Sequence, residues 1–438
     1  MSDAPMAGFP PPPESVVSVE NWQEPPFNRW SFQHLREIVP TQRITRGARA
    51  KALALSDKPP ALDHIGVTRL GAGPSTVLEV LADTWTDAVI VLHDGQVVLE
   101  RYFGQMRANT PHLLMSVSKS IVGCVCGILA SKRRLDPAAP VTQYIPEIAG
   151  SGYDGATVRH LLDMRTGVAF SETYEDPNAE VRVMERQVGW RPGREHESAG
   201  LYAYLTSLSS HGPHGGPFVY RSADTDVLGW VCERAAGVRM ADLVSTLIWA
   251  PIGAEYDAEI TCDGLGSAVH DGGVSATARD LARFGKMLLD DGWVGPRRIV
   301  PESWLQQARH IDADIRGAFG LRLGAGPAGR LVPQPVLVRP RTVRRHLAVP
   351  RHPRPDGLCR PRHPHRRGEA LVMAGASGSH PSGRHDPGLR SRRPAPGRVR
   401  AGRGCRRGQA AGPERHRRGS GTRARVTVSV TPRSRGTA

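Results

Sequence analysis

Ser116 and Lys119 stand three positions apart at the start of an apolar run, His112–Leu129. On a helix, positions i and i+3 share one face, so the lysine amine can lie beside the serine hydroxyl. A serine at a helix N-terminus also meets unpaired backbone N–H groups and the positive end of the helix dipole, which favour negative charge on its oxygen. This is the arrangement of an activated nucleophile. The spacing alone occurs by chance about once in a chain of this length, so it fits a surface serine beside an extended lysine equally well.

Tyr220 is the second chemical candidate, because it lies just upstream of a helix predicted over 225–236. A phenol beside a cation gives up its proton more readily, and it can then accept the serine proton and pass it to a leaving group. Lys119 would supply that cation. A tyrosine packed in the core is the alternative, and without further context it is the more frequent of the two.

The elements around these residues predict how they are positioned. Ala88–Phe103 contains two β-rich runs around His-Asp-Gly-Gln, which is typical of a hairpin that enters a sheet. Helices are expected over 157–164, 198–207, 225–236 and 277–291, and from Pro301 onward. Strands at the beginning, a helical middle and strands at the end, which appear only when the tail is read in another frame, predict a sheet assembled from both ends of the chain.

The composition divides the chain near residue 320. Residues 320–438 contain 28 Arg, no Lys, four acidic residues and no Phe, Trp or Tyr, whereas residues 1–319 hold all 24 aromatic side chains and a net charge of −8. The net charge of +16 therefore comes from the tail alone. An Arg-rich segment without aromatics is typical of disorder and of electrostatic binding to nucleic acid.

A second explanation is that the tail is an out-of-frame translation of GC-rich coding DNA. If the DNA is read one base later, each new codon consists of the last two bases of one original codon and the first base of the next. Leu331–Val338 then permits WYRNQYWY, Arg351–Arg360 permits GIHGQMVYVD, and 366–374 permits VVVKLSSWP. One constant offset thus recovers strand-like, aromatic sequence, which a selected nucleic-acid-binding tail has no reason to contain. We expect residues 320–438 to be out of frame and disordered.

Other features limit the class of protein. Residues 1–25 begin Pro-rich, show no positively charged and apolar signal segment, and are expected to be disordered. No run approaches the roughly 18 apolar residues of a membrane span, and the six cysteines show no metal-binding spacing. We expect a reduced, cytoplasmic protein that needs no metal or organic cofactor and binds neither membrane nor nucleic acid. The oligomeric state stays open, a homodimer included.

Four motifs in this order resemble the serine β-lactamase and penicillin-binding-protein superfamily. They are Ser116-x-x-Lys119, a helical region with Leu161–Gly167, Tyr220-x-Ser222 before a helix, and Asp271–Gly285. Within that superfamily the chain resembles the class C-like branch, specifically the 6-aminohexanoate-dimer hydrolases, which cleave nylon oligomers, and their carboxylesterase relatives. The resemblance extends from about Asn28 to Phe319.

The resemblance implies an α/β (α+β) fold of the β-lactamase/transpeptidase type. An antiparallel sheet flanked by helices and a mainly helical domain would occupy residues 26–319, with the C-terminal strands missing or disordered. The resemblance makes Ser116 the acylated nucleophile, Lys119 the cation that tunes it, and Tyr220 the general acid and base. Tyr174 and Trp190 match a mobile tyrosine and a tryptophan that close over the linear amide in family members, with ordinary packing as an equal alternative.

Two departures from the family pattern stand out. Ser222 replaces the Asn of lactamases, which fits hydrolases of linear amides or esters better than those of β-lactams. The family's closing strand, with a Gly-x-His-Gly-Gln stretch that supplies one oxyanion-hole N–H opposite that of Ser116, is missing in this frame, and GIHGQ in the shifted frame would be that strand. Glu185 lies near where such enzymes place a carboxylate for the substrate amine, with an exposed charge as the alternative.

The leading prediction is a serine hydrolase of a small-molecule linear amide or ester that works through an acyl-enzyme on Ser116. A DD-peptidase or β-lactamase is the nearest competing function, and the missing export signal argues against it because that substrate lies outside the cytoplasm. Two further possibilities are a non-catalytic domain with a polyanion-binding tail and an inactive frameshifted product.

Overall fold

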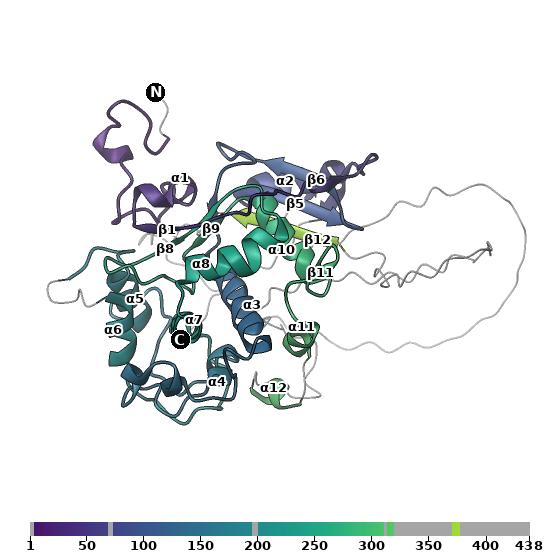
Figure 1. Cartoon of the computed structure of the whole chain (residues 1–438). Helices are drawn as coiled ribbons and strands as arrows, with labels where there is room; N and C mark the ends of the chain where they lie inside the picture. Colours follow the sequence, from purple (N-terminus) through teal and green to yellow (C-terminus); the bar gives the residue numbers. More distant parts are fainter. Residues whose placement is uncertain (1–3, 69–72, 195–199, 311–312, 319–369, 377–438) are drawn as a thin grey trace, which may run out of the picture. The chain divides into compact units, whose positions relative to one another are not determined.

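The structure, a computed structural model, describes residues 4–68, 73–194, 200–310, 313–318 and 370–376 (Figure 1). For 370–376 it describes the backbone alone. The larger compact unit lies within Met1–Leu62 and Leu81–Gly378. The described part of the smaller unit is the segment Asp63–Val80, which contains the hairpin of β3 (Gly66–Thr68) and β4 (Pro74–Thr76).

Two four-stranded sheets form the β part of the larger unit. One has the strand order β12-β5-β6-β2 and the other β1-β8-β9-β7. The strands are β1 Thr41–Ile44, β2 Ala54–Leu55, β5 Thr86–His93, β6 Gln96–Tyr102, β7 His112–Leu113, β8 Ala258–Thr261, β9 Val274–Ala276 and β12 Ala370–Ala376, with a separate hairpin of β10 Trp293–Val294 and β11 Arg297–Arg298. β1 pairs with β8 and β7 with β9, so this sheet joins strands that lie far apart in the sequence. β8 and β9 were not predicted, because the sequence placed the late strands in the shifted reading of the tail.

The β5–β6 hairpin confirms the predicted hairpin. Its two turn residues, Asp94 and Gly95, have φ values of +50° and +79°. Positive φ at both positions is the condition for the type I′ turn, whose twist matches that of the paired strands. Ile90 of β5 and Ala282 of α10 belong to one buried cluster, so α10 covers a face of this sheet.

The helices fill the rest of the larger unit. They are α1 Asn28–Ser31, α3 Ser118–Ser131, α4 Val158–Leu162, α5 Glu180–Gln187, α6 Gly200–Ser207, α7 Ser222–Ala236, α8 Met240–Val244, α9 Ala250–Ile252, α10 Ala278–Leu289, α11 Glu302–Arg309 and α12 Ala313–Ala318, with α2 Val77–Asp83 at the boundary between the units. Short 3-10 turns lie at Pro13–Ser15, Leu35–Glu37, Leu62–His64, Met115–Val117, Val141–Gln143 and Pro146–Ile148, and a π-helical turn at Ser245–Trp249. A helix overlaps each range predicted from the sequence, with ends that differ by a few residues. The predicted start of the helix 198–207 lies outside the described residues.

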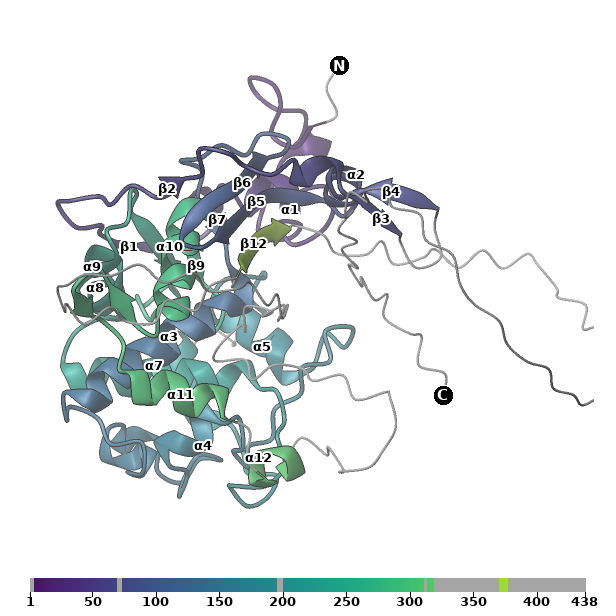
Figure 2. The same ribbon diagram turned by 90° about the vertical axis from the view of Figure 1, so that its right-hand side faces the viewer.

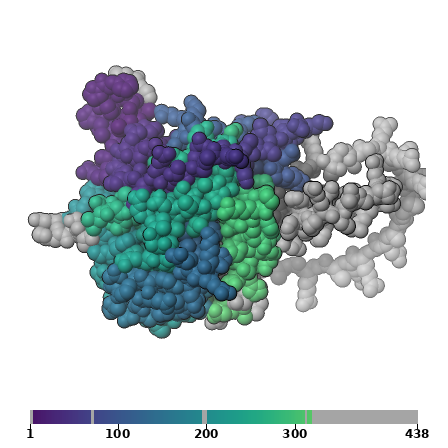
Figure 3. All heavy atoms as spheres, viewed as in Figure 1, coloured from purple at the N-terminus to yellow at the C-terminus, as the bar shows by residue number. Residues whose placement is uncertain are grey.

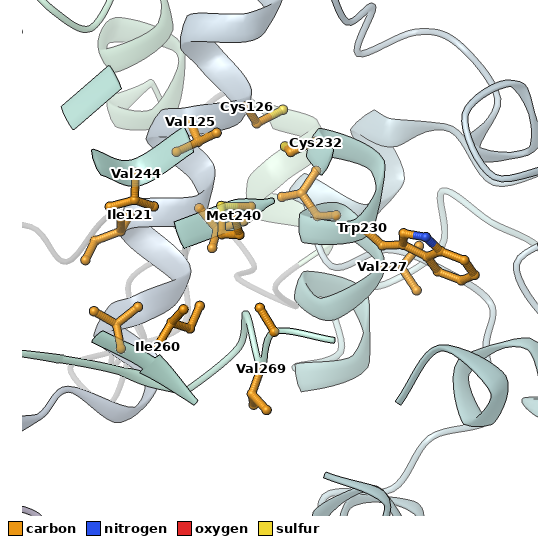
Figure 4. Close-up of a cluster of buried hydrophobic side chains, with 14 of the residues drawn as sticks. Ile121, Val125, Cys126, Val227, Trp230, Cys232, Met240, Val244, Ile260 and Val269 are labelled. Carbon is orange, nitrogen blue, oxygen red and sulfur yellow. The ribbon is translucent and has the colours of Figure 1, made fainter. Parts of the chain in front are cut away.

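Helix α3 is the central element of the larger unit, and Figure 2 shows it between the sheets and the other helices. Twelve of its fourteen residues are buried, so the helix is enclosed on every side, and its buried residues include the polar Ser118, Lys119 and Ser120. Figure 4 shows Ile121 and Val125 of this helix close to Val244 of α8, with Val227 of α7 in the same core. Gly127 lets α11 approach, because a Cβ there would lie 2.5 Å from the ring of Trp304. This packing fixes the helix that begins at the Ser116 turn.

Residues 4–25 differ from the expectation of a disordered N-terminus. Figure 3 shows this segment, in purple, at the surface of the larger unit. Trp22 is 1% exposed, and its Nε1 donates a hydrogen bond to the Trp190 carbonyl oxygen at 2.7 Å. Burial of the Trp22 indole, whose N–H keeps a hydrogen bond, stabilises the folded segment. This gain in free energy exceeds the entropy cost of ordering the Pro-rich segment.

One segment of the Arg-rich tail differs from the expectation that the C-terminal strands are missing or disordered. β12 pairs antiparallel with β5, from Ala370 opposite His93 to Ala376 opposite Thr86. Its sequence, Ala-Leu-Val-Met-Ala-Gly-Ala, is uncharged and free of Pro, so its backbone can pair along the edge of β5. The predictions for the rest of 320–438 fall on residues outside those that the structure describes.

Across the described ranges, no single helix is long and apolar enough to cross a membrane. One bent pair, Ser222–Ala236 with Met240–Ile252, meets the length and composition criteria together.

Candidate active site

Ser116 lies in the 3-10 turn η4 (Met115–Val117), directly before α3. Met115 has a φ of +46°, in the left-handed region that residues with side chains seldom adopt. The turn is tied to the sheet because the Leu114 N–H donates to the carbonyl oxygen of Val274 in β9 at 2.8 Å. This geometry leaves Ser116 exposed, although the next residues of α3 are buried.

Lys119 lies one turn further on and is completely buried. Its Nζ donates to Ser116 Oγ at 3.2 Å, to Ser222 Oγ at 3.2 Å and to the Asp271 carbonyl oxygen at 2.8 Å. The Asp271 carboxylate is 3.3 Å away. Burial by itself lowers the pKa of Lys119, but the Asp271 carboxylate raises the pKa, and the net shift is upward. The amine is therefore held as an ammonium.

Tyr220 completes the group from the segment that precedes α7. Its hydroxyl donates to Ser116 Oγ at 2.7 Å, and Lys119 Nζ lies 5.2 Å from the centre of its ring. The structure thus brings together the three residues that the sequence singles out for chemistry, with the serine oxygen between an ammonium and a phenol.

Two carboxylates beside this group were not predicted as site residues. Asp271 pairs with Lys119, and Glu172 accepts hydrogen bonds from the Ser222 N–H and from the Tyr174 hydroxyl. Burial raises the pKa of Glu172, and the bond from Ser222 only partly opposes this effect. Asp271 is the first residue of the last of the four sequence motifs. The distance in sequence between Ser116 and either carboxylate, however, does not predict that the two lie together. Only the fold places them here.

Tyr174 and Trp190 lie at the edge of the group. Tyr174 is 46% exposed, and its hydroxyl donates to Glu172 Oε2 at 3.2 Å. Trp190 is 5% exposed and packs edge to face against Trp22. A Cβ on Gly272, the residue after Asp271, would lie 3.0 Å from the Trp190 ring. The Trp190 Nε1 has no hydrogen-bond partner among the described residues.

Glu185 differs from one of the two expectations for it. It is 7% exposed, so it is not a surface charge. Arg182 and Arg191 donate to its Oε2 at 2.6 and 2.5 Å. Two guanidinium groups therefore compensate the charge of this carboxylate.

Two further features of the described residues concern other possible sites. Within the part of the chain that the structure describes, no three His, Cys, Asp or Glu side chains are placed to hold a metal ion. A hollow of about 480 Å³ lies at the opposite end of α3 from Ser116 and contains none of the residues above. It is lined by Ala130, Arg133, Arg134, Leu135, Asp136, Pro137, Gln143 and Tyr144.

Comparisons with known proteins identify the family of this chain. Residues 79–336 match the family described as Beta-lactamase. A 6-aminohexanoate-dimer hydrolase from Paenarthrobacter ureafaciens is 42% identical over 292 residues, which cover 66% of this chain and 71% of the relative. Esterase EstB from Burkholderia gladioli is 30% identical over 201 residues, which cover 42% of this chain and 50% of the relative.

A solved structure from Bacillus anthracis, which carries a provisional 6-aminohexanoate-dimer hydrolase assignment, superimposes with a TM-score of 0.64 at 28% identity. The match covers 69% of this chain and 79% of that one. It confirms the β-lactamase/transpeptidase-like fold predicted from the sequence. The chain belongs to the beta-lactamase family and is a serine hydrolase of the amide- or ester-cleaving type.

Proposed function

We propose that this chain hydrolyses linear amides or esters through an acyl-enzyme on Ser116, with Lys119 as the neighbouring cation and Tyr220 as the general acid and base. One observation carries the proposal. Ser116 Oγ lies 3.2 Å from Lys119 Nζ and 2.7 Å from the Tyr220 hydroxyl oxygen, and Ser116 itself is exposed to substrate.

Acylation begins when Ser116 Oγ attacks the carbonyl carbon and its proton moves to the Tyr220 oxygen. When the tetrahedral intermediate collapses, the C–N or C–O bond breaks and Tyr220 gives this proton to the leaving amine or alcohol. For this transfer Tyr220 must first lose the hydroxyl proton that it donates to Ser116 Oγ in the structure. The ammonium of Lys119 then stabilises the phenolate that accepts the serine proton.

Deacylation repeats these transfers with water in place of the leaving group. Water attacks the acyl carbon and gives one proton to the Tyr220 oxygen. The bond to Ser116 Oγ then breaks, and Tyr220 returns the proton to the serine. The products are a carboxylic acid and the free enzyme.

We propose a linear amide similar to the 6-aminohexanoate dimer as the substrate class. The 42% identity to the Paenarthrobacter hydrolase supports this choice. Trp190 and Tyr174 are the proposed contacts for the substrate chain, because Trp190 packs on Gly272 beside the Lys119 partner and Tyr174 is joined through Glu172 to the start of α7. Glu185 receives no role, since two arginines already occupy it.

We further propose that the coding sequence shifts by one base near residue 320. The shifted reading of Arg351–Arg360 permits GIHGQMVYVD, which contains the Gly-x-His-Gly-Gln stretch expected of the closing strand. That strand would supply one of two oxyanion-hole donors, and loss of one such donor costs about 10²- to 10³-fold in rate. Resequencing codons 315–322 tests this proposal, and an unchanged reading frame there would contradict it.

Covalent labelling tests the nucleophile. The chain as sequenced and a chain with the frame restored are each treated with a fluorophosphonate probe, and the labelled peptide is identified by mass spectrometry. We expect the label on Ser116, its loss in Ser116→Ala, and its retention in Ser131→Ala at the other end of α3. Release of amine from the 6-aminohexanoate dimer and of nitrophenol from nitrophenyl esters then distinguishes amide from ester preference.

Three outcomes would favour other functions. Absence of label on Ser116 in the frame-restored chain contradicts the proposed mechanism. Stable acylation by penicillin would favour a DD-peptidase or β-lactamase. Salt-dependent binding of DNA or RNA that disappears on truncation after Phe319 would favour a functional basic tail.

A further inference from the structure

Asp271 contacts Lys119 through both its backbone and its side chain. The carbonyl oxygen accepts from Lys119 Nζ at 2.8 Å, and carboxylate Oδ2 lies 3.3 Å from the same nitrogen. Asp271 is 8% exposed, and its Oδ1 has no hydrogen-bond partner among the described residues. A buried carboxylate is costly unless an opposite charge compensates it, so each of these two charges depends on the other.

Helix α7 holds the backbone of Asp271 in place. Asp226, fully buried in α7, accepts from the N–H groups of His270 at 2.8 Å and Asp271 at 3.1 Å through one oxygen. The His270 ring packs against Gly229 of the same helix, where a Cβ would lie 2.1 Å from the ring. Two adjacent N–H groups on one carboxylate and a ring seated on a glycine fix the direction of this peptide. The carbonyl and the carboxylate of Asp271 therefore both point at Lys119.

Four ionisable groups from four segments face Lys119. They are Asp271 before β9, Tyr220 before α7, Glu172 before α5 and Asp226 within α7. Among the described residues, only Asp271 places a carboxylate oxygen within hydrogen-bonding distance of Nζ. Burial raises the pKa of Asp226, and the charge of Asp271 raises it further. The direct ion pair of Lys119 is with Asp271.

We propose that Asp271 is a positioning residue for the reaction at Ser116, which holds Lys119 as an ammonium between the serine oxygen and the ring of Tyr220. This inference rests on the proposed function and deepens it, because it assigns the charge state of the lysine to one carboxylate. Without that carboxylate, burial favours the neutral amine. The positive charge that stabilises a phenolate at Tyr220 would then be lost.

The test replaces Asp271 by Asn, which keeps the side-chain shape and the backbone carbonyl but removes the charge. The chain contains five lysines, so Lys119 can be followed by NMR of protein labelled with ¹³C at lysine Cε and assigned with Lys119→Arg. We expect the titration midpoint of Lys119 to fall by about 1–3 pH units in Asp271→Asn. The alkaline limb of the pH profile for fluorophosphonate labelling of Ser116 should move down by the same amount.

Two further variants control the measurement. Asp290→Asn removes a carboxylate from the partly exposed Lys286–Asp290 pair and should change neither the Lys119 midpoint nor the labelling profile. Asp271→Glu keeps the charge and should lie closer to the wild type than Asp271→Asn in both readouts. Thermal unfolding identifies variants that do not fold. If Asp271→Asn does not fold, the Lys119 midpoint and the labelling profile are compared between Asp271→Glu and the wild type.

The outcomes separate this inference from the proposed function. An unchanged Lys119 midpoint in Asp271→Asn, or equal losses in the Asn and Glu variants, would overturn the role of Asp271 even if Ser116 is labelled. A shifted midpoint without labelling of Ser116 in any variant would support the coupling between Asp271 and Lys119 and overturn the proposed hydrolysis instead.

Discussion

Ser116 differs from the serines that follow it in exposure and in partners. Ser118 is fully buried, and its Oγ accepts from the Val274 N–H at 3.1 Å, so it holds the helix to the sheet. Ser120 is 1% exposed, and its Oγ has no partner in the described part of the chain. Ser116 is exposed and lies within reach of both Lys119 and Tyr220. Its chemistry therefore comes from its place in the turn and from its neighbours rather than from residue type.

Tyr220→Phe removes the hydroxyl that contacts Ser116 Oγ while leaving the ring in place. We expect kcat for ester hydrolysis to fall by about 10²- to 10⁴-fold, because general acid–base catalysis contributes this much, with a much smaller change in KM. Steady-state kinetics of the frame-restored chain measures both constants. Tyr256→Phe, at an exposed tyrosine outside the site, is the matched control. A loss below about tenfold would assign proton transfer to another group.

At the scale of elements, α7 organises the site with its first two turns. Ser222 accepts from Lys119, and Asp226 holds the peptide of Asp271. Between them, Asp224 accepts from the Thr166 hydroxyl at 2.8 Å and the Tyr153 hydroxyl at 3.2 Å. One helix start thus joins the lysine, the loop before β9 and the segment after α4. Such buried polar positions are retained at a cost in solvation.

The cost of burying Asp224 predicts a pH dependence of stability. Burial raises the pKa of Asp224 from 3.8 to about 7, despite the opposing bond from Thr166. Between these values the folded state holds a proton that the unfolded state has released, so the free energy of unfolding falls as pH rises through this window. Above pH 7 the full penalty is present.

Asp224→Asn should remove this dependence while keeping an acceptor oxygen for Thr166 and Tyr153. Relative to the variant, we expect the wild type to lose about 2–4 kcal/mol of unfolding free energy between pH 4 and pH 7.5. Urea unfolding at several pH values measures the difference, and Asp176→Asn, at an exposed residue, is the control. Parallel curves for wild type and Asp224→Asn would show that Asp224 stays ionised in the folded protein.

At the scale of the whole molecule, the site combines segments that lie far apart in the sequence. Its groups come from positions 116 to 271, and both four-stranded sheets join early strands to late ones. β12 extends this pattern, since it is the strand from the Arg-rich tail that lies beside β5. An uncovered β5 would expose a long apolar edge that can pair with other chains.

Truncation tests the contribution of β12. A chain that ends at Ala376 should unfold at the same temperature as the full chain. A chain that ends at Phe319 lacks β12, and it should unfold at a lower temperature and aggregate more. Thermal unfolding followed by light scattering measures both effects. Equal behaviour of the two truncated chains would mean that β12 contributes nothing to the fold.

The sequence by itself determined the local features of this protein. Asp94-Gly95 specifies its hairpin turn, Thr277 accepts from the Asp280 N–H to begin α10, and the Ser116–Lys119 spacing places both side chains on one face. These features depend on neighbours within about four residues, so propensity and periodicity reveal them. The position of Tyr220 before a helix made it a candidate, and the resemblance then gave it a role beside Ser116, which lies 104 positions away.

Only the tertiary structure decided which distant groups surround the nucleophile. Asp271 reaches Lys119 from 152 positions away because Asp226 and Gly229 of α7 set its loop, and Trp22 is ordered by its contact with Trp190. No spacing rule links such residues, because their proximity results from the packing of whole helices and strands. The sequence therefore predicts Ser116 as the nucleophile and the class of chemistry, while the fold brings the Asp271 carboxylate to the lysine beside it.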